Sequence, residues 1–399
     1  IDRPSITDKE FIEVRNMIRK AKIVITNPAF LMADMKRLAE NRRKSYLVDF
    51  LEDVDLVVID ELDFYGSRGA SLLIAMIELI LKYVALKRPQ IVVLTATLGN
   101  AEELASILTS MNGRDTVILE GKPFRVQNCT YIVYGKNLDS FRDKVKEVIN
   151  RSEFKQDILR DLEEFLQDST AFKRNVRYII EYLRSYGLEV PEPYFDPAEL
   201  ISRYVDDEGV TVVFTPSIRT AERLARRIIE LLPPDKKGLV VTHHHLVPKH
   251  VRDEIERAAR DSKPKVKIIV TVRTLLQGVD IPTIVRVVHY GLPVELREYL
   301  QREGRKGRRE ELEFTESVII PITPWDRAVL AHGIFGVEEF NGLPLEKIYI
   351  LRSNKYPLLF KALFKVVAGI SLSKDERELL KELELVEEVP TLEGFRVIK

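Results

Sequence analysis

At 399 residues the chain is too long for one hydrophobic core, so we expect roughly two or three domains. Its 45% hydrophobic and 31% charged residues exclude a disordered chain, and its single cysteine, Cys129, excludes internal disulfides and cysteine-based zinc sites. The net charge of zero limits nucleic-acid contacts to local basic patches, and no stretch approaches the roughly 18 apolar residues of a membrane span, so we expect a soluble, cytoplasmic protein with no membrane partner.

The first part of the chain, residues 1–125, alternates between apolar strand-like runs and helical patterns. The expected strands cover residues 21–26, 56–59, 91–94 and 116–119. The expected helices cover residues 8–19, 30–45, 69–86 and 101–111. Helix 69–86 is apolar nearly all round, which indicates burial. Strands that alternate with helices predict an α/β domain with a doubly wound parallel sheet.

This rhythm stops for residues 126–208, which we interpret as a connecting strand, a helical insertion and a proline-containing linker. A second α/β domain is expected over residues 209–340. Its strands are expected at residues 210–214, 239–242, 266–270, 285–289 and 318–320. Residues 341–399 form a C-terminal extension with a capping box at Ser373 and Glu376 and a short β pair near Gly394, a pattern similar to a winged helix.

An apolar run at residues 57–59 leads directly into the acidic sequence Asp60-Glu61-Leu62-Asp63. P-loop NTPases use two such carboxylates at the carboxyl end of a buried strand, an Asp that holds Mg²⁺ and a neighbouring Glu that orients water. The alternative interpretation is an ordinary solvated strand end.

Five further motifs occur before and after the acidic one. They are Thr26-Asn27-Pro28, Thr95-Ala96-Thr97, Val213-Phe214-Thr215-Pro216-Ser217, Gly278-Val279-Asp280-Ile281-Pro282 and Gln301-Arg302-Glu303-Gly304-Arg305-Lys306-Gly307-Arg308. In this order the six motifs resemble the motor of a superfamily 2 helicase, in which two RecA-like domains clamp ATP between them and nucleic acid across them. The resemblance covers about residues 1–325, and the phrases around Tyr65, His243 and His289 are most similar to Hrq/Mrf-type DNA repair helicases.

The resemblance implies ATP and Mg²⁺ as cofactors and assigns a role to each motif. Asp60 would hold Mg²⁺, and Glu61 would orient the attacking water. Arg305 and Arg308, three residues apart on a helical turn, would reach the γ-phosphate as arginine fingers. The remaining nucleotide contacts are assigned to Gln301, Gly278 and Asp280, and coupling of hydrolysis to domain movement is assigned to Thr95 and Thr97.

Candidate nucleic-acid contacts are hydroxyl, amide and imidazole groups, which position a strand without reading its sequence. They are Thr26, Asn27, Thr215, Ser217, His243, His244 and Thr274. A metal site at the histidines is disfavoured, because adjacent residues of an extended segment point to opposite faces. Arg302, Lys306 and Arg309 are expected to enlarge a basic patch. Two interpretations stay open for the aromatic residues of the insertion, base stacking and helix packing. These residues are Phe172, Tyr178, Tyr182 and Tyr186, interspersed with basic residues that include Arg177.

Two departures from the family pattern matter. Val272 stands where the family usually has Thr, and no G-x-x-x-x-G-K-[ST] loop occurs to cradle phosphates. We therefore expect the first RecA-like domain to be N-terminally truncated, the missing loop to lie on a removed segment or a partner chain, and this chain alone to be inactive. The leading hypothesis is an ATP-dependent helicase that translocates on single-stranded DNA. A non-catalytic nucleic-acid-binding scaffold derived from a helicase and a DEAD-box RNA helicase are the alternatives.

Overall fold

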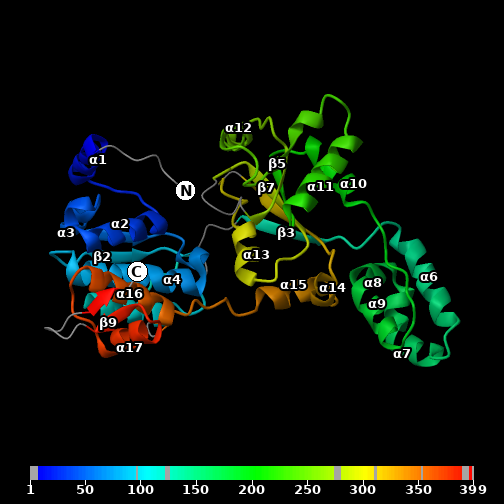
Figure 1. Cartoon of the computed structure of the whole chain (residues 1–399). Coiled ribbons are helices and arrows are strands. Elements are labelled where there is room, and N and C mark those ends of the chain that lie inside the picture. Colours follow the sequence, from blue (N-terminus) through cyan, green and yellow to red (C-terminus); the bar gives the residue numbers. More distant parts are fainter. Residues whose placement is uncertain are drawn as a thin grey trace. The chain divides into compact units, whose positions relative to one another are not determined.

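The computed structural model describes residues 8–95, 98–121, 126–273, 280–309, 312–351, 354–388 and 395–397. The chain divides into two compact units (Figure 1). The first combines Ile1–Glu120 with Glu346–Lys399, and the second is Gly121–Leu345. The polypeptide therefore leaves the first unit, forms the whole of the second, and then returns to the first.

A parallel pair of strands forms the sheet of the first unit, with Val58 of one strand opposite Val92 of the other. The strands are β1 (Leu56–Ile59) and β2 (Gln90–Val93). The helices of this part of the unit are α1 (Asp8–Lys20), α2 (Pro28–Glu40), α3 (Val48–Glu52), α4 (Gly66–Tyr83) and α5 (Ala101–Asn112), with a 3₁₀ turn η1 (Arg42–Lys44) after α2. The predicted strands 56–59 and 91–94 are thus confirmed, and the helices begin and end within a few residues of their predicted limits.

Helix α4 supplies the core of this unit, as its apolar pattern predicts. Its side chains Ile74, Met76 and Leu79 are each at most 2% exposed and pack with residues of α2 and α5. The stretch Leu62–Tyr83 is long and apolar enough to cross a membrane by length and composition, and half of its most apolar part is buried inside the structure. Core helices of soluble proteins pass the same test, so this finding fits a core helix.

Two predicted strands of the first unit are wrong. Residues 21–26 and 116–119 are extended or irregular and pair with no strand in the part of the chain that the structure describes. Their apolar side chains are strongly exposed, with Ile25 at 94% and Leu119 at 89%. A strand needs a hydrogen-bonded neighbour as well as a β-rich sequence, and these segments have only the sequence.

The returning C-terminal segment completes the first unit. Helix α16 (Lys355–Val367) packs on α4 and α2, and Ile348 and Phe364 join the same core. Helix α17 (Lys374–Glu382) follows with the predicted capping box at Ser373 and Glu376. Strands β9 (Val386–Glu388) and β10 (Phe395–Val397) form the short antiparallel pair that the sequence predicts. We expected residues 341–399 as a separate extension, whereas Glu346–Lys399 groups with the first unit.

The second unit is built on a parallel sheet whose strands, within the described residues, lie in the order β3-β8-β7-β4-β6-β5. Their bounds are β3 (Gln127–Ile132), β4 (Val210–Phe214), β5 (Val240–His243), β6 (Ile268–Thr271), β7 (Ile284–Tyr290) and β8 (Phe314–Ile320). The five strands predicted for residues 209–340 are all present, and the expected connecting strand is β3, which pairs with β8 at the edge of the sheet.

Both faces of this sheet are covered, which makes it doubly wound. Every residue of β4 is buried, as the continuous apolar run of a central parallel strand predicts. Val213 packs on one face against α10 and α11, and its neighbours Val212 and Phe214 pack on the other face with α12. The helices are α10 (Pro197–Arg203), α11 (Ile218–Leu231), α12 (Lys249–Arg260), α13 (Leu296–Glu303), α14 (Pro324–Val329) and α15 (Ile334–Asn341), and two 3₁₀ turns are η3 (Tyr204–Asp206) and η4 (Lys237–Leu239).

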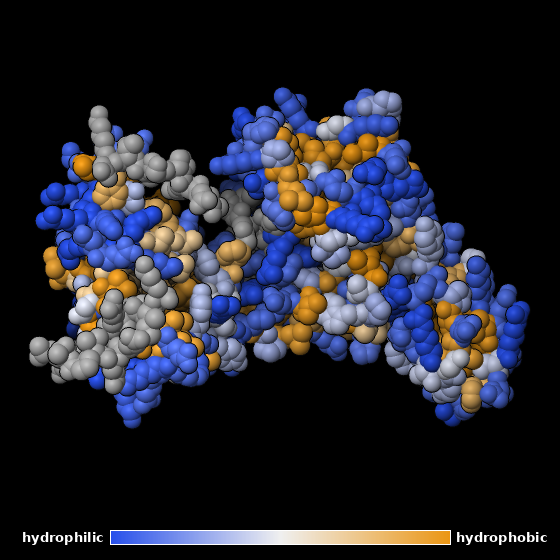
Figure 2. Space-filling model, viewed as in Figure 1, coloured by the Kyte–Doolittle hydropathy of each residue, from blue (hydrophilic) through white to orange (hydrophobic). Residues whose placement is uncertain are grey.

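The insertion between β3 and α10 is helical, as predicted, and has a core of its own. It consists of α6 (Leu138–Asn150), α7 (Lys155–Gln167), α8 (Ser169–Arg174) and α9 (Val176–Ser185). Phe172 is 1% exposed within this core, and Arg177 is buried and paired with Glu192 (2.8 Å). Base stacking is therefore excluded for Phe172 in this structure, whereas Tyr178, Tyr182 and Tyr186 are half-buried. The visible face of the insertion is largely hydrophilic, with apolar residues between the charged ones (Figure 2).

Candidate nucleotide and nucleic-acid site

The acidic residues after β1 lie in a turn with an uncommon backbone. Asp60 is exposed, and Glu61 adopts the left-handed conformation (φ 48°, ψ 51°) immediately before the 3₁₀ turn η2 (Leu62–Tyr65). A residue other than glycine holds this conformation only where the surrounding structure enforces it, and such strain clusters at functional sites. Here the buried side chains of Leu62 and Asp63 anchor the turn. Both predicted catalytic carboxylates are thereby placed at the carboxyl end of β1.

Strand β2 brings the predicted coupling residue Thr95 to the same turn. The Leu94 amide donates to the Ile59 carbonyl (2.8 Å), so the two strand ends lie side by side. The Thr95 hydroxyl then donates to Oδ1 of the buried Asp63 carboxylate (3.0 Å). Sequence order alone separates these two motifs by about 30 residues, and the parallel pairing of β1 with β2 joins them. Thr95 is therefore tied to the acidic motif through Asp63.

Thr26 and Asn27 are exposed immediately before α2. The Asn27 side chain caps this helix, because its Oδ1 accepts a hydrogen bond from the Phe30 amide (2.8 Å), and Pro28 occupies the first helical position. The motif around Asn27 thus has a local structural role that accounts for both the Asn and the Pro. A contact of Thr26 or Asn27 with nucleic acid stays a prediction.

In the second unit, α13 is followed by residues 304–308, which carry both predicted arginine fingers. We call this segment the arginine loop. Gln301 and Arg305 are half-buried, and Arg308 is exposed. Nη1 of Arg308 donates to Oδ1 of Asp280 at 2.6 Å, in an ion pair whose members are 28 residues apart in the sequence. The structure therefore brings together two residues that the sequence assigned separately to the nucleotide. The arginine loop therefore contacts the segment that leads into β7.

Thr215 and Ser217 follow β4, and both have local hydrogen-bond partners. Thr215 is 2% exposed, and its hydroxyl is within 3.1 Å of the carbonyls of both Ser217 and Thr271. Ser217 is exposed and caps α11 by accepting from the Thr220 amide (3.2 Å). Of these two predicted nucleic-acid contacts, only Ser217 lies at the surface in this structure.

The two histidines at the end of β5 are also inside the unit. His243 is 1% exposed with its Nε2 3.1 Å from Glu256, and His244 is 4% exposed with its Nε2 2.7 Å from Glu222. Burial lowers the pKa of His243, and its hydrogen bond to Glu256 only partly offsets that effect. As a correction to our expectation, neither imidazole is exposed for a direct contact with nucleic acid. No group of metal-ligating side chains occurs among the described residues, here or elsewhere.

Three predicted site residues lie outside the described residues. They are Thr97, Thr274 and Gly278. Their assignments to coupling, to nucleic acid and to nucleotide stay predictions.

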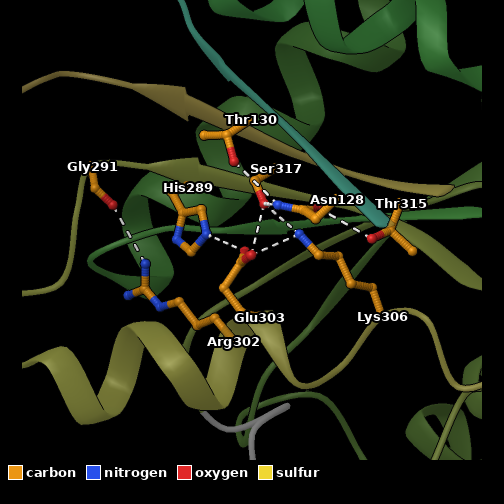
Figure 3. A network of polar contacts seen from close by, with 9 residues as sticks. All are labelled: Asn128, Thr130, His289, Gly291, Arg302, Glu303, Lys306, Thr315 and Ser317. Carbon is orange, nitrogen blue, oxygen red and sulfur yellow. Dashed lines mark hydrogen bonds and ion pairs between the residues drawn. The ribbon is translucent and has the colours of Figure 1, made fainter. Parts of the chain in front are cut away.

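Sequence reasoning missed a buried polar cluster beside the arginine loop (Figure 3). Arg302 is 5% exposed and the Lys306 side chain is also 5% exposed, so these two residues do not enlarge a basic surface patch as expected. Arg302 bonds Glu298 (2.7 Å), and Lys306 bonds Glu303 (2.8 Å). The signal was present in the sequence, because opposite charges three or four residues apart meet on one side of a helical turn.

Comparison with known proteins supports the order of these motifs. The DEAD/DEAH box helicase family matches residues 3–104, and the helicase conserved C-terminal domain matches residues 197–310. The DNA helicase Hel308 of Methanococcus vannielii is 27% identical over 77% of this chain. The Hel308 of Pyrococcus abyssi is 25% identical over 78% of it. The chain spans 39% and 40% of the lengths of these two proteins.

Solved structures agree on the fold. The DUF1998 helicase MrfA bound to DNA superposes on 97% of this chain with a TM-score of 0.65 and 19% identity, and the match covers 45% of that chain. The Mycobacterium smegmatis helicase Lhr bound to single-stranded DNA and AMP-PNP superposes on 95% with a TM-score of 0.57 and 18% identity, and the match covers 41% of that chain. Both units therefore have the RecA-like fold that the sequence predicts. With both halves of a helicase motor matched in order, this chain belongs to the superfamily 2 helicases.

Proposed function

We propose that the protein is an ATP-dependent helicase or translocase that acts on DNA, of the same kind as the Hrq/Mrf-type repair helicases. The support for DNA is the nature of the relatives, since Hel308 is a DNA helicase, and MrfA and Lhr were solved with DNA. The site itself supports nucleotide hydrolysis, because phosphoryl transfer needs positioned charges more than covalent chemistry.

The observation that carries this proposal is the acidic turn after β1. Asp60 is an exposed carboxylate of the type that Mg²⁺ prefers, so it fits the role of metal ligand when Mg²⁺ arrives with ATP. Glu61, held in a left-handed conformation, accepts a hydrogen bond from the attacking water and orients it. A left-handed conformation in a residue other than glycine clusters at functional sites, so the backbone of Glu61 disfavours the solvated-strand interpretation.

The second unit carries its own set of proposed nucleotide-binding groups, Arg305 and Arg308 together with Gln301. In this structure the guanidinium of Arg308 is neutralised by Asp280, 2.6 Å away. A nucleotide phosphate competes with that carboxylate for the same donor atoms, whereas the ribose hydroxyls offer Asp280 a replacement partner. Both groups therefore exchange one polar partner for another when nucleotide binds.

The 399 residues contain no phosphate-binding loop, and we propose that polypeptide outside them supplies it. In the first unit Ile25 is 94% exposed and Val58 of β1 is 51% exposed, so these apolar side chains are available to pack against further polypeptide. Binding of ATP by the chain alone is therefore expected to be weak. The proposed activity belongs to the complete protein.

The test compares two acidic substitutions in the complete gene product, with DNA-stimulated ATP hydrolysis and strand separation as readouts. Glu61→Gln keeps the shape of the side chain but cannot orient water as a carboxylate does, so turnover is expected to fall by about 10²-fold or more while DNA affinity is unchanged. Asp55→Asn at the opposite end of β1 is the matched control, and it should leave both unchanged. Full turnover in Glu61→Gln would remove Glu61 from the mechanism.

The absence of the phosphate loop also favours a second function, that of a non-catalytic scaffold that binds nucleic acid. The two candidates differ in a single measurement. A complete gene product that binds DNA but hydrolyses no ATP would establish the scaffold, and parallel assays with RNA duplexes would identify an RNA substrate.

A further inference from the structure

A buried ion pair lies directly behind the arginine loop (Figure 3). Glu303, the last residue of α13, accepts a hydrogen bond from Lys306 Nζ on its Oε2 (2.8 Å). Its Oε1 is 2.9 Å from His289 Nε2 on β7, and Ser317 on β8 donates to its Oε2 (2.7 Å). The side chains of His289 and Lys306 are 0% and 5% exposed. One carboxylate thus receives donors from two strands and from the loop itself.

The contacts continue to the edge of the sheet. Lys306 Nζ also donates to Ser317 Oγ, and the side-chain amide of Asn128 donates to the same hydroxyl (3.0 Å). Thr315 in turn donates to Oδ1 of Asn128 (3.2 Å). Asn128 lies on β3, the first strand of the second unit, so the network spans β3, β8 and β7. A loop attached at Glu303 and Lys306 is therefore attached to three strands.

Charges buried at this depth are costly unless each is paired and hydrogen-bonded. Hydrophobic side chains of similar size would fill the same space at no such cost, so the pair is poorly explained by stability alone. The effect of the pair is local, because Gly304 and Arg305 lie between its two members in the sequence and Gly307 follows directly.

The arginine loop is also held at Gly307, by close contacts with β7, β8 and the start of β3. Gly307 has φ +69°, its amide donates to the Ile284 carbonyl (3.3 Å), and a Cβ at this position would lie 3.3 Å from Thr315 and 3.5 Å from Val126. Val126 immediately precedes β3. The backbone of residues 304–308 is thus confined between the ion pair and the start of β3, while Arg308 extends outward to Asp280.

We propose that Glu303 and Lys306 are positioning residues that fix the arginine loop on β3, β7 and β8. This inference rests on the proposed function for its catalytic consequence, and on the geometry alone for its structural one. Neither residue touches nucleotide. Their role is to hold the backbone that carries Arg305 and Arg308 in one geometry, since misplacement of a charged group by about 1 Å can cost about 10²-fold in rate.

The first test measures amide hydrogen exchange in this chain, which needs no nucleotide and no activity. Glu303→Gln and Lys306→Met each leave the other charge buried and unpaired, so exchange of the amides in residues 304–308 is expected to rise about tenfold or more. The double variant Glu303→Gln, Lys306→Met removes both charges and is expected to recover part of the protection. Unchanged exchange in both single variants would overturn the proposal.

A matched control separates positioning from loss of stability. Arg286 is also buried in this sheet, and its ion pairs go to Glu316 and Asp207 rather than to residues 304–308. Arg286→Met is expected to destabilise the second unit without selectively raising exchange in residues 304–308. An equal rise in the control would show a global effect and would also overturn the proposal.

The second test measures kinetics in the complete gene product. Glu303→Gln is expected to lower ATP turnover by about 10²-fold while the KM for ATP changes little, because the loop acts when charge develops on the phosphates. A rise in KM with unchanged turnover would contradict the positioning role. If the loop exchanges faster in the variants but the unaltered protein hydrolyses no ATP, the proposed function fails and the attachment of the loop stands.

Discussion

At the scale of single residues, Glu303 shows how its surroundings decide the behaviour of a buried acid. Burial alone would raise the pKa of Glu303, but the hydrogen bond from His289 and the positive charge of Lys306 outweigh burial and hold it at about 2, against a usual 4.5. The unfolded chain therefore binds a proton at a pH where the folded chain does not. Stability that is present above pH 4.5 is lost as the pH falls toward 2, and the loss from this group amounts to about 3 kcal/mol.

This prediction can be followed with Trp325, the single tryptophan of the chain, which lies in the second unit. Denaturant unfolding monitored by its fluorescence should give a stability difference between the unaltered chain and Glu303→Gln that shrinks as the pH falls from about 5 to about 2. Glu208→Gln changes an exposed carboxylate of the same unit and should show no such trend. A difference that stays constant over this range would mean that the Glu303 carboxylate is not held in its charged form.

The motifs predict which residues belong to the site, but they do not predict most of the hydrogen-bond and ion-pair partners of those residues. Asp60, Glu61 and Arg308 stand where the family pattern puts them. The contacts of Thr95 with Asp63 and of Arg308 with Asp280 join residues 32 and 28 positions apart, and only the strand order brings them together. The pairing of Glu303 with Lys306 was accessible, because it is local.

At the scale of elements, the helical insertion illustrates how one aromatic pattern fits both helix packing and base stacking. Phe172 fills the core formed by α6–α9, so Phe172→Ala is expected to destabilise the insertion by about 3–5 kcal/mol, through lost burial and a residual cavity. Loss of helical circular dichroism on heating measures this effect. DNA affinity at a temperature where the variant is folded should be unchanged.

The matched control for Phe172 is Tyr194→Ala, because Tyr194 is an aromatic residue of the same unit with 78% of its surface exposed. Its removal should leave the thermal transition in place. Weaker DNA binding by Phe172→Ala without a loss of stability would restore the base-stacking interpretation.

Helices and strands could be predicted where the pattern of apolar residues within the segment is enough to specify the element. Helix α4 is apolar nearly all round and strand β4 is mostly apolar, and both are largely buried as expected. Residues 21–26 and 116–119 carry an equally β-rich sequence but pair with no strand among the described residues. Strand formation depends on a neighbour elsewhere in the chain, and no local pattern reports that neighbour.

At the scale of the whole molecule, the return of the chain to the first unit was not visible in the sequence. The apolar positions of residues 346–399 indicate a packed segment but not which core receives it. In the structure this segment packs on the core of the first unit, where Ile348 and Phe364 pack with α4. At the point of return, Asn100 donates to the Ile348 carbonyl and accepts from the Ile348 amide, both at 3.0 Å, and Ser67 accepts from the next amide, that of Tyr349 (2.9 Å).

Asn100→Ala tests whether this point of return stabilises the first unit. The substitution removes the two hydrogen bonds to Ile348 and a third to Glu103 (2.7 Å) from a side chain that is 5% exposed. A buried backbone group left without its partner costs about 1–3 kcal/mol. Calorimetry should therefore show a lower transition temperature for the first unit, whereas the transition reported by Trp325 in the second unit stays in place. Asn150→Ala, at an exposed helix end in the second unit, should alter neither transition. If Asn100→Ala instead shifts the Trp325 transition and spares the other, the segment from residue 346 onward stabilises the second unit in solution, and its assignment to the first unit is wrong.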